Sequence, residues 1–365
     1  METRSSNFHI DLIIEILSRL PVKSLMRFKC VCKSWYTLVK NPYLISKHFK
    51  DYNDDNTHLL TYDRNGGRIN LFTGKTFADL SWIYLDHHMF NIEQIKGPFN
   101  GIFCLFQNYE SIILWNPAIR ELRKLRNCLR SSFQCATYHC NVGFGLDPVC
   151  NDYKLVLIRS VEDYERFQHE YLDVWLYNLR FDFWTQIEID KLRDYCLLKW
   201  QDSTYLSGVC YWLAIRDRNL QKMCVISFNL SNEVFEEIQG PFSNHRFDKF
   251  VLGLYNNSLS LMHSVYRTSS ICFDLWVMNG RCWTKQLTVG PLQGVTNTLG
   301  NWNNGDLLLQ SGLFNLLLDD PNTQKIRDFD LLTYATVFHR YKESILTVKL
   351  DDHGFDIPWN ILGVF

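Results

Sequence analysis

A short unit recurs along most of this 365-residue chain, and it constrains the fold more than any other feature. Each copy has an apolar run typical of a β-strand, a short polar turn, and a second run that begins near an aromatic or aliphatic residue. A weaker copy, residues 59–63 with 68–72, precedes five clear ones: 112–117 with 120–122, 174–179 with 184–187, 225–230 with 235–238, 273–278 with 283–287, and 316–319 with 325–326.

The spacing of the copies predicts a propeller. Matched positions at 114, 174, 225, 275 and 316 are separated by 60, 51, 50 and 41 residues. This is the range of a kelch-like β-propeller blade, in which about 50 residues form four strands. We expect an all-β propeller of about six blades, with seven left open, closed by residues 344–350 pairing with the first blade. A β-sandwich is the competing fold, but it does not predict a repeated unit.

The first fifty residues follow a helical pattern instead. One apolar stripe of 3.6-residue period runs to Leu20, and Pro21 ends it because proline lacks the backbone N–H. Two or three further helices follow, so the fold class is α+β multidomain, with a helical module at 1–50 and a propeller at 51–365. So small a module buries little apolar surface by itself. Its apolar stripe packs either against a partner protein or against the rest of the chain, and the pattern does not distinguish the two.

Charge is divided unevenly between these parts. Residues 1–50 carry nine basic and three acidic residues, a net of +6, which leaves 29 basic and 36 acidic residues, a net of -7, for the remainder. The basic residues alternate with apolar ones at helical spacing, which favours a solvated helix face over a nucleic-acid site. No apolar run reaches the roughly 18 residues of a membrane helix, and no secretory signal begins the chain. We expect a soluble protein of the cytoplasm or nucleus with reduced cysteines.

Motifs for catalysis, cofactors and metals are lacking. Residues 74–76 resemble the end of a phosphate-binding loop but lack its first glycine, and His87-His88 has no carboxylate at helical spacing. The cysteines between 128 and 150 do not have the spacing of a zinc site. We therefore expect no enzyme, cofactor or metal, and structural roles for prominent residues: core for Trp115, Trp175, Trp212 and Trp276, positive-φ turns for Gly97, Gly101, Gly143 and Gly145, and backbone N–H acceptors for Asp152 and Asp274.

Residues 11–35, DLIIEILSRLPVKSLMRFKCVCKSW, closely resemble a plant F-box. The resemblance implies a helical module that docks on a Skp-type adaptor, which bridges to a cullin scaffold and a RING-bound ubiquitin-conjugating enzyme. Where the family usually has Leu-Pro, this chain has Phe8-His9, so adaptor binding is expected to survive in weakened form. Carried over by position, the adaptor contacts would be Leu12, Ile13, Ile16, Leu17, Leu20, Pro21, Leu25 and Trp35.

Segments of the body resemble the plant F-box-associated domain, most of all that of S-locus F-box proteins: residues 97–101, 114–120, 142–147, 151–154, 208–214, 274–278, 287–293 and 341–344. This resemblance implies a non-catalytic substrate receptor of an SCF-type E3 ubiquitin ligase. In that branch the targets are non-self S-RNases, basic ribonucleases of the style met in the pollen-tube cytoplasm during self-incompatibility. The acidic body is compatible with such a partner.

Two other functions stay open at this point: an F-box receptor for an unrelated endogenous plant protein, and a free-standing propeller that acts as a binding module. The residues that bind the target are unknown from the sequence. Binding surfaces of propellers lie on loops, and three long ones are candidates, at residues 128–140, 162–170 and 296–304.

Overall fold

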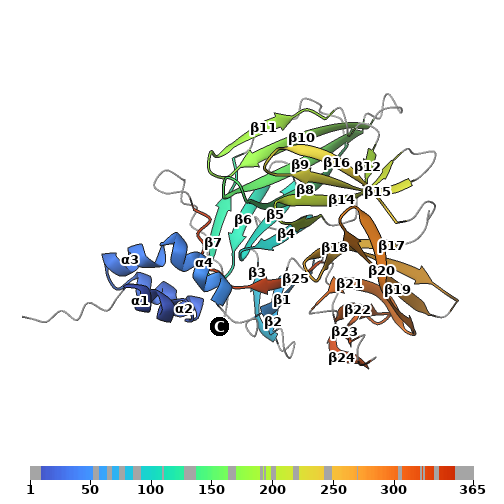
Figure 1. The fold of residues 1–365 in the computed structure, drawn as a ribbon. Coiled ribbons are helices and arrows are strands. Elements are labelled where there is room, and N and C mark those ends of the chain that lie inside the picture. Colours follow the sequence, from blue (N-terminus) through green and yellow to red (C-terminus); the bar gives the residue numbers. More distant parts are fainter. Residues whose placement is uncertain are drawn as a thin grey trace, which may run out of the picture. The chain divides into compact units, whose positions relative to one another are not determined.

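The computed structural model describes residues 10–51, 57–63, 68–73, 79–84, 92–108, 111–126, 137–162, 170–189, 192, 195–198, 203–216, 222–241, 249–268, 270–302, 306–320, 323, 325–332 and 337–349. Within these ranges four helices precede the strands of six sheets (Figure 1). Phe8-His9, which stand where the F-box family usually has Leu-Pro, lie outside these ranges, and so do residues 74–76 and 87–88.

The four short helices form the segment that we call the head, residues 10–51. They are α1 (Ile10–Leu17), α2 (Val22–Lys29), α3 (Lys33–Val39) and α4 (Pro42–Asp51), which confirms the predicted helical module. Helix α1 ends before Pro21, and Pro21 is the N-cap of α2 with φ -57°. Proline suits this place because its fixed φ matches a helix start and it has no N–H to leave unbonded.

Each of the six sheets is one blade of an antiparallel propeller, as the repeat predicts. The first is β25 (Val337–Lys342), β1 (Thr57–Asp63), β2 (Arg68–Thr73) and β3 (Asp79–Tyr84); the second is β4 (Gln94–Phe99), β5 (Ile102–Asn108), β6 (Ser111–Asn116) and β7 (Glu121–Lys124); the third is β8 (Thr137–Asp147), β9 (Asp152–Glu162), β10 (Glu170–Asn178) and β11 (Phe183–Ile187).

The remaining three blades follow the same order along the chain. The fourth is β12 (Tyr195–Leu197) and β13 (Thr204–Leu206), both paired with β14 (Val209–Arg216), then β15 (Lys222–Asn229) and β16 (Val234–Gln239); the fifth is β17 (Lys249–Tyr255), β18 (Ser258–Tyr266), β19 (Ile271–Asn279) and β20 (Cys282–Leu292); the sixth is β21 (Val295–Asn301), β22 (Leu307–Ser311), β23 (Asn315–Asp320) and β24 (Lys325–Leu332).

The repeated unit of the sequence is the hairpin of a blade's third and fourth strands. Its five clear copies coincide with β6–β7, β10–β11, β15–β16, β19–β20 and β23–β24. The weak copy at residues 59–72 was matched to the wrong hairpin. It lies on β1 and β2, the second and third strands of its sheet, because the first strand of that blade is β25 from the far end of the chain.

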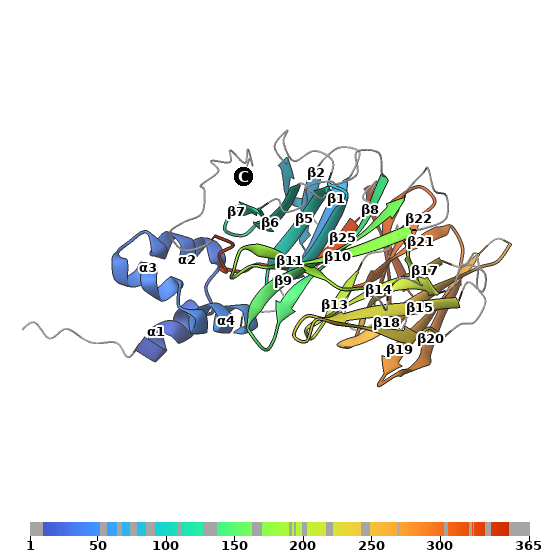
Figure 2. The ribbon, with the colours of Figure 1, turned by 90° about the horizontal axis from the view of Figure 1, so that it is seen from above.

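The strand that completes the first blade is also not the predicted one. Residues 344–350 were expected to pair with the first blade, but β25 does so, and residues 343–349, which we call the strap, form no strand. The reason is that a side chain uses the strap's backbone: the Asn116 amide Nδ2 donates to the carbonyl oxygens of Ser344, at 3.0 Å, and Leu346, at 2.7 Å. Figure 2 shows this red segment running beside the head and β7.

By its internal contacts the chain divides into two compact units. One comprises Met1–Leu105, Ile112–Leu125 and Phe338–Phe365, and so holds the head, the first blade, the strap and most of the second blade. The other comprises Phe106–Ser111 and Arg126–Val337, which includes the third to sixth blades.

The four glycines divide into two kinds. Gly97 and Gly101 have φ of +104° and +80°, which confirms the expected positive-φ turns. For Gly143 and Gly145, within β8, that expectation was wrong, because neither has a positive φ. They are needed for close packing: a Cβ on Gly143 would lie 2.5 Å from the Trp212 ring, and one on Gly145 would overlap the Tyr205 ring.

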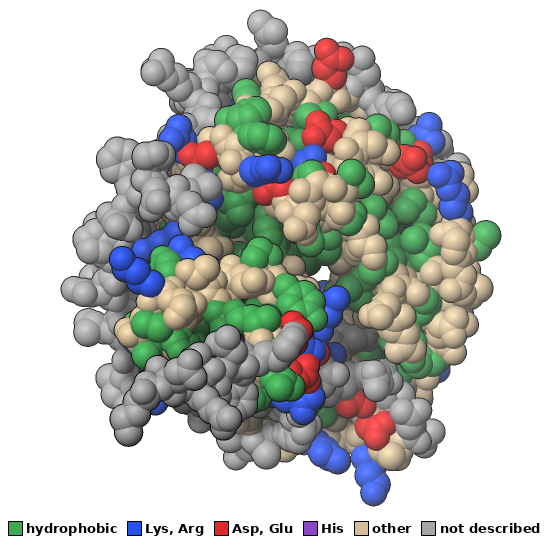
Figure 3. Space-filling view, turned by 60° about the vertical axis from the view of Figure 1, so that its left-hand side comes forward, with side chains coloured by type: hydrophobic (Ala, Val, Ile, Leu, Met, Phe, Trp, Pro, Cys, Tyr) green, Lys and Arg blue, Asp and Glu red, His purple; other side chains and the backbone are tan. Residues whose placement is uncertain are grey.

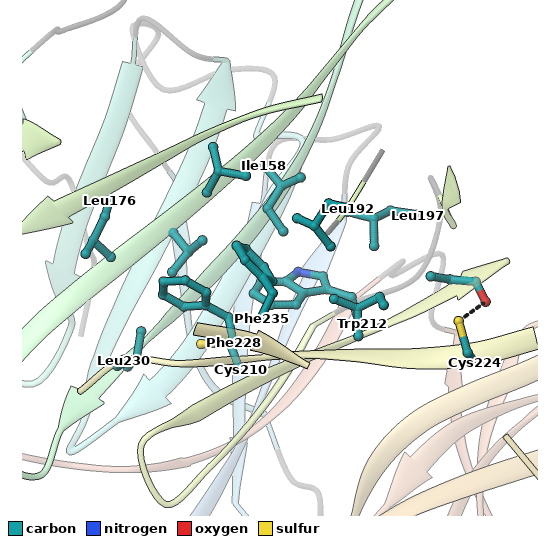
Figure 4. Packing of buried hydrophobic residues seen from close by; sticks show 14 residues of the cluster. Ile158, Leu176, Leu192, Leu197, Cys210, Trp212, Cys224, Phe228, Leu230 and Phe235 are labelled. Atoms are coloured by element: carbon teal, nitrogen blue, oxygen red, sulfur yellow. Dashed lines mark hydrogen bonds between the residues drawn. The ribbon is translucent and has the colours of Figure 1, made fainter. Parts of the chain in front are cut away.

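The core of the second unit is built around such aromatic contacts (Figure 4). Trp212 is 2% exposed and packs among buried residues of the third and fourth blades, including Phe228 and Phe235, whose ring centroids are 4.4 Å apart. Trp115 is also buried, while Trp175 and Trp276 are half-buried. The tryptophans therefore contribute to packing within and between blades and are not exposed binding residues.

Buried charges join neighbouring hairpins in this unit. Lys154 Nζ lies 3.0 Å from Asp147 Oδ2 and 3.0 Å from Glu233 Oε1, and it donates to the carbonyl oxygen of Leu230 at 2.6 Å. Lys154 and Asp147 are both nearly inaccessible. A buried ammonium is tolerated because these oxygens replace its water, so the cluster fixes the β8–β9 turn to the β15–β16 turn.

The two aspartates named from the sequence differ in their partners. Asp152 Oδ2 accepts the backbone N–H of Arg180 at 3.1 Å, as expected. Asp274 instead accepts from side chains, with Lys285 Nζ at 2.7 Å and Thr288 Oγ1 at 2.6 Å. The expectation was wrong for Asp274 because it lies inside β19, where the strand ladder already uses the neighbouring N–H groups.

Candidate functional site

The candidate site begins with helix α1, which is apolar on two faces. Ile14 and Leu17 are buried in the core of the head. On the opposite face Leu12 and Ile16, which are one turn apart, are 56% and 59% exposed. Ile10, the first residue of the helix, is 53% exposed but lies on the same side as Ile14 and Leu17. Large aliphatic side chains scattered singly are common at surfaces, but Leu12 and Ile16 are neighbours four residues apart and form a contiguous apolar face that a partner would stabilise.

The eight residues predicted to contact an adaptor occupy three kinds of position. Leu12, Ile16 and Pro21 are exposed. Ile13, Leu20 and Trp35 are half-buried and pack against the head's core. Leu17 and Leu25 are 2% and 0% exposed, so they support the surface from below and offer no area to a partner.

Sequence reasoning missed several exposed apolar residues of the head. Val31, in the α2–α3 turn, is 67% exposed, and Tyr43 at the start of α4 is 63% exposed. Tyr36 is exposed on α3, with Lys29 Nζ 5.4 Å and Lys40 Nζ 4.7 Å from its ring centroid. The available signal was an aromatic residue with a lysine four positions after it, a spacing that places Tyr36 and Lys40 on one helical side. Lys29 belongs to α2, so its approach to the ring depends on the α2–α3 turn.

An ion pair joins α1 to α4, and a second lies within α4. Lys47 Nζ lies 2.9 Å from Glu15 Oε2 and 2.7 Å from Asp51 Oδ2. Hydrogen bonds with Lys47 and Arg19 lower the pKa of Glu15, and those with Asp51 and Glu15 raise the pKa of Lys47.

Figure 3 brings forward the side of the molecule that carries the helices, and it shows hydrophobic side chains at the surface among basic and acidic ones.

The head is attached to the second blade and the strap through its own core. Ile345 of the strap is 4% exposed within the head's apolar cluster, and Ala118 and Ile119 of the β6–β7 turn pack against that cluster. Glu121 Oε2 accepts hydrogen bonds from the Thr347 hydroxyl at 2.6 Å and the Val348 N–H at 3.1 Å. The exposed face of α1 is therefore carried by a module that packs on the propeller.

The three predicted target loops are located only in part. Residues 127–136, covering most of the first, and 163–169, covering the second, lie outside the described ranges. The third, 296–304, was wrongly predicted to be a loop, because most of it is strand β21, paired with β22. Its polar residues are typical of a loop, but here they belong to a strand: the Asn297 amide Nδ2 donates a hydrogen bond to Gln310 Oε1 across the ladder.

An exposed aromatic pair on the third blade was not predicted. Phe181 and Phe183, at the β10–β11 turn, are 65% and 50% exposed, with ring centroids 6.0 Å apart. The Arg180 guanidinium lies 5.9 Å from the Phe181 ring centroid. This is a second apolar surface, smaller than that of the head.

Metal-ligating side chains do not gather in the described ranges. Those residues contain no cluster of three His, Cys, Asp or Glu side chains able to hold a metal ion. Among them, too, no helix has the length and apolarity to cross a bilayer.

Comparison with known proteins agrees with this geometry. Residues 75–350 match the family model described as the F-box associated beta propeller domain, and residues 5–47 match the F-box domain. An F-box/kelch-repeat protein of Arabidopsis thaliana is 26% identical over 310 residues, covering 78% of this chain and 80% of its own. The F-box/WD-40 repeat-containing protein 1 of the same plant is 27% identical over 300 residues, covering 76% and 68%.

Among solved structures, oligogalacturonate lyase in complex with manganese has a TM-score of 0.43 and 8% identity, covering 74% of this chain and 77% of that one, a likeness that carries no argument about function. The family models together span nearly all described elements, from the head to the last blade. The chain therefore belongs to the family of F-box proteins with an F-box-associated β-propeller.

Proposed function

We propose that this protein is the substrate-recognition subunit of an SCF-type E3 ubiquitin ligase. The observation that carries the proposal is the exposed apolar face of α1, formed by Leu12 and Ile16, within a segment that matches the F-box domain. This face, with Ile13, Leu20, Pro21 and Trp35 at its margin, would dock on a Skp-type adaptor, which bridges to a cullin. Leu17 and Leu25 would hold the face in shape.

The propeller would bind the target protein. We place the boundary between the two parts at residue 50, next to the end of α4 at Asp51. The receptor itself would perform no chemistry: it would raise the local concentration of target lysines at the charged conjugating enzyme, which accelerates transfer by proximity and orientation. Such a receptor would act in the cytoplasm or nucleus.

We further propose that the target is a non-self S-RNase, recognised in the pollen tube during self-incompatibility. The support is the resemblance of residues 97–101, 114–120 and 142–147 to S-locus F-box proteins, together with the net charge of -7 on residues 51–365, which suits a basic partner. An endogenous plant protein is the second candidate target, since relatives in this family come from Arabidopsis under the general name of F-box proteins.

One purification tests both levels of the proposal. The tagged chain is recovered from pollen tubes grown with style extract and a proteasome inhibitor, and its partners are identified by mass spectrometry. Adaptor, cullin and a basic ribonuclease together would support the whole proposal. Adaptor and cullin with another protein would move the target away from self-incompatibility, and absence of any Skp-type adaptor would refute the ligase role.

A further inference from the structure

An asparagine ends the third strand in four of the six blades, at Asn116, Asn178, Asn229 and Asn279. In two of them its Oδ1 caps the following turn. Asn229 Oδ1 accepts the N–H of Ser231 at 2.8 Å, and Asn116 Oδ1 accepts the N–H of Ala118 at 3.1 Å. Asn116 therefore performs the turn-capping role of its repeat position.

Asn116 has an additional role that Asn229 lacks. Its Nδ2 donates to two strap carbonyls, Ser344 and Leu346. Asn116 is 0% exposed, and the bond to Ser344 is buried while that to Leu346 is partly buried. The Nδ2 of Asn229 makes no such contact among the described residues. A buried carbonyl without a donor costs free energy, so the amide fixes where the strap lies.

The strap is held from two sides. On the blade side, Glu121 accepts from Thr347 and Val348, and a Cβ on Gly101 would overlap Ser344. On the head side, Ile345 is part of the core that contains Leu25 and Leu44. The strap thus joins the second blade by hydrogen bonds and the head by apolar packing.

We propose that the strap holds the head in one orientation on the second blade, and that Asn116 and Glu121 are positioning residues for ubiquitin transfer. This inference rests on the proposed ligase function. Because transfer depends on the geometry between the conjugating enzyme and the target lysine, an anchored head restricts which lysines are reached. Neither residue lies on the exposed face of α1, so adaptor binding does not depend on them directly.

Asn116→Asp isolates the strap bonds. The aspartate keeps an oxygen for the Ala118 N–H but loses both donor hydrogens and places a carboxylate against two carbonyl oxygens. Asn229→Asp is the matched control, since it keeps the acceptor for Ser231 and has no strap donor to lose. Glu121→Ala removes the other anchor and serves if Asn116→Asp does not fold.

Two measurements on the full chain alone test the anchor. Hydrogen exchange measures the protection of the backbone amides of Leu346 and Val348, which in the wild-type chain donate to Ser344 Oγ and Glu121. Small-angle X-ray scattering reads the head's position. We expect Asn116→Asp and Glu121→Ala to speed exchange by about tenfold or more and to broaden the distance distribution, with Asn229→Asp unchanged. Wild-type scattering from a variant whose strap exchanges freely would overturn the proposal, as would equal broadening in Asn229→Asp.

A reconstituted reaction then tests the functional part. The chain is assembled with Skp-type adaptor, cullin–RING, conjugating enzyme and ubiquitin, and the lysines that it modifies on itself are mapped by mass spectrometry. We expect adaptor affinity at the wild-type level in both anchor variants and a wider set of modified lysines than in wild type or Asn229→Asp. An unchanged lysine set would refute the positioning role. Failure of the wild-type chain to bind adaptor would refute the ligase function and leave the anchor measurements valid.

Discussion

Ile16→Asp and Leu25→Ala should separate the surface of the head from its core. Both residues belong to the predicted adaptor contacts, yet Ile16 is 59% exposed and Leu25 is 0% exposed. Ile16→Asp removes no buried contact of the free chain, so its unfolding free energy should change by less than about 0.5 kcal/mol. Leu25→Ala leaves a cavity in the head's core and should cost about 2–5 kcal/mol.

For adaptor binding the order of the two variants should be the opposite: Ile16→Asp should weaken binding directly, at the interface. Burying the exposed part of Ile16 at an interface is worth about 1–2 kcal/mol, and an unpaired carboxylate buried there adds about 1–3 kcal/mol more. Together these predict a loss of about 2–5 kcal/mol, which is at least about 30-fold in affinity for a Skp-type adaptor at about 1.4 kcal/mol per tenfold. Leu25→Ala should weaken binding only as far as it unfolds the head.

Calorimetric titration with purified adaptor gives the affinity, and urea unfolding followed by hydrogen exchange in α1–α4 gives the stability of the head. Leu20→Asp is a poorer probe, because Leu20 is half-buried against the same core and would change both quantities. Tight adaptor binding by a folded Ile16→Asp chain would show that the exposed face of α1 is not the interface. Unchanged stability of Leu25→Ala would refute the assignment of that residue to the core.

Three further predictions concern the propeller. In Gly145→Ala the new methyl group meets the Tyr205 ring, so urea unfolding should show a loss of about 1–3 kcal/mol. Burial opposes ionisation of Asp147, but hydrogen bonds, one of them from Lys154, outweigh it and lower the pKa of Asp147. The stability that this carboxylate contributes is present above pH 3.8 and is lost as the pH falls further. When unfolding is followed during acid titration, the Asp147→Asn chain should lack this pH-dependent loss of stability. Burial and neighbouring aspartates raise the pKa of Asp319, whose Oδ2 has no hydrogen-bond partner among the described residues. The charged form of Asp319 therefore destabilises the fold above pH 3.8. Asp319→Asn should raise the melting temperature at pH 7 and not at pH 3, and an equal gain at both pH values would contradict this account.

The sequence predicts the parts of the fold that depend on local pattern. Apolar runs and turn residues recur from blade to blade, and an asparagine ends the third strand in four of them, so the hairpins β6–β7, β10–β11, β15–β16, β19–β20 and β23–β24 are visible from spacing alone. Strand β25 is not, because its ladder partner β1 lies at the other end of the propeller segment and no local signal names it. Gly143 likewise depends on Trp212, a residue of another blade.

The candidate site was predictable as a segment but not as a surface. Helix α1 carries apolar residues on two faces, and a period of 3.6 residues does not say which face is covered. Only the packed structure separates Ile14 and Leu17 from Leu12 and Ile16, because Ile345 and the β6–β7 turn complete the core on one side. Such long-range contacts leave no trace in the local sequence.

The same long-range contact has a consequence for synthesis of the chain. The head leaves the ribosome first, but its core stays incomplete until Ile345 arrives, and the bond between Asn116 and Ser344 spans 228 residues. Contacts of such separation form late in folding. A nascent or truncated chain that lacks the strap would therefore carry an unfinished head, so that, under the proposed function, the surface for the adaptor is completed only after the strap has been made.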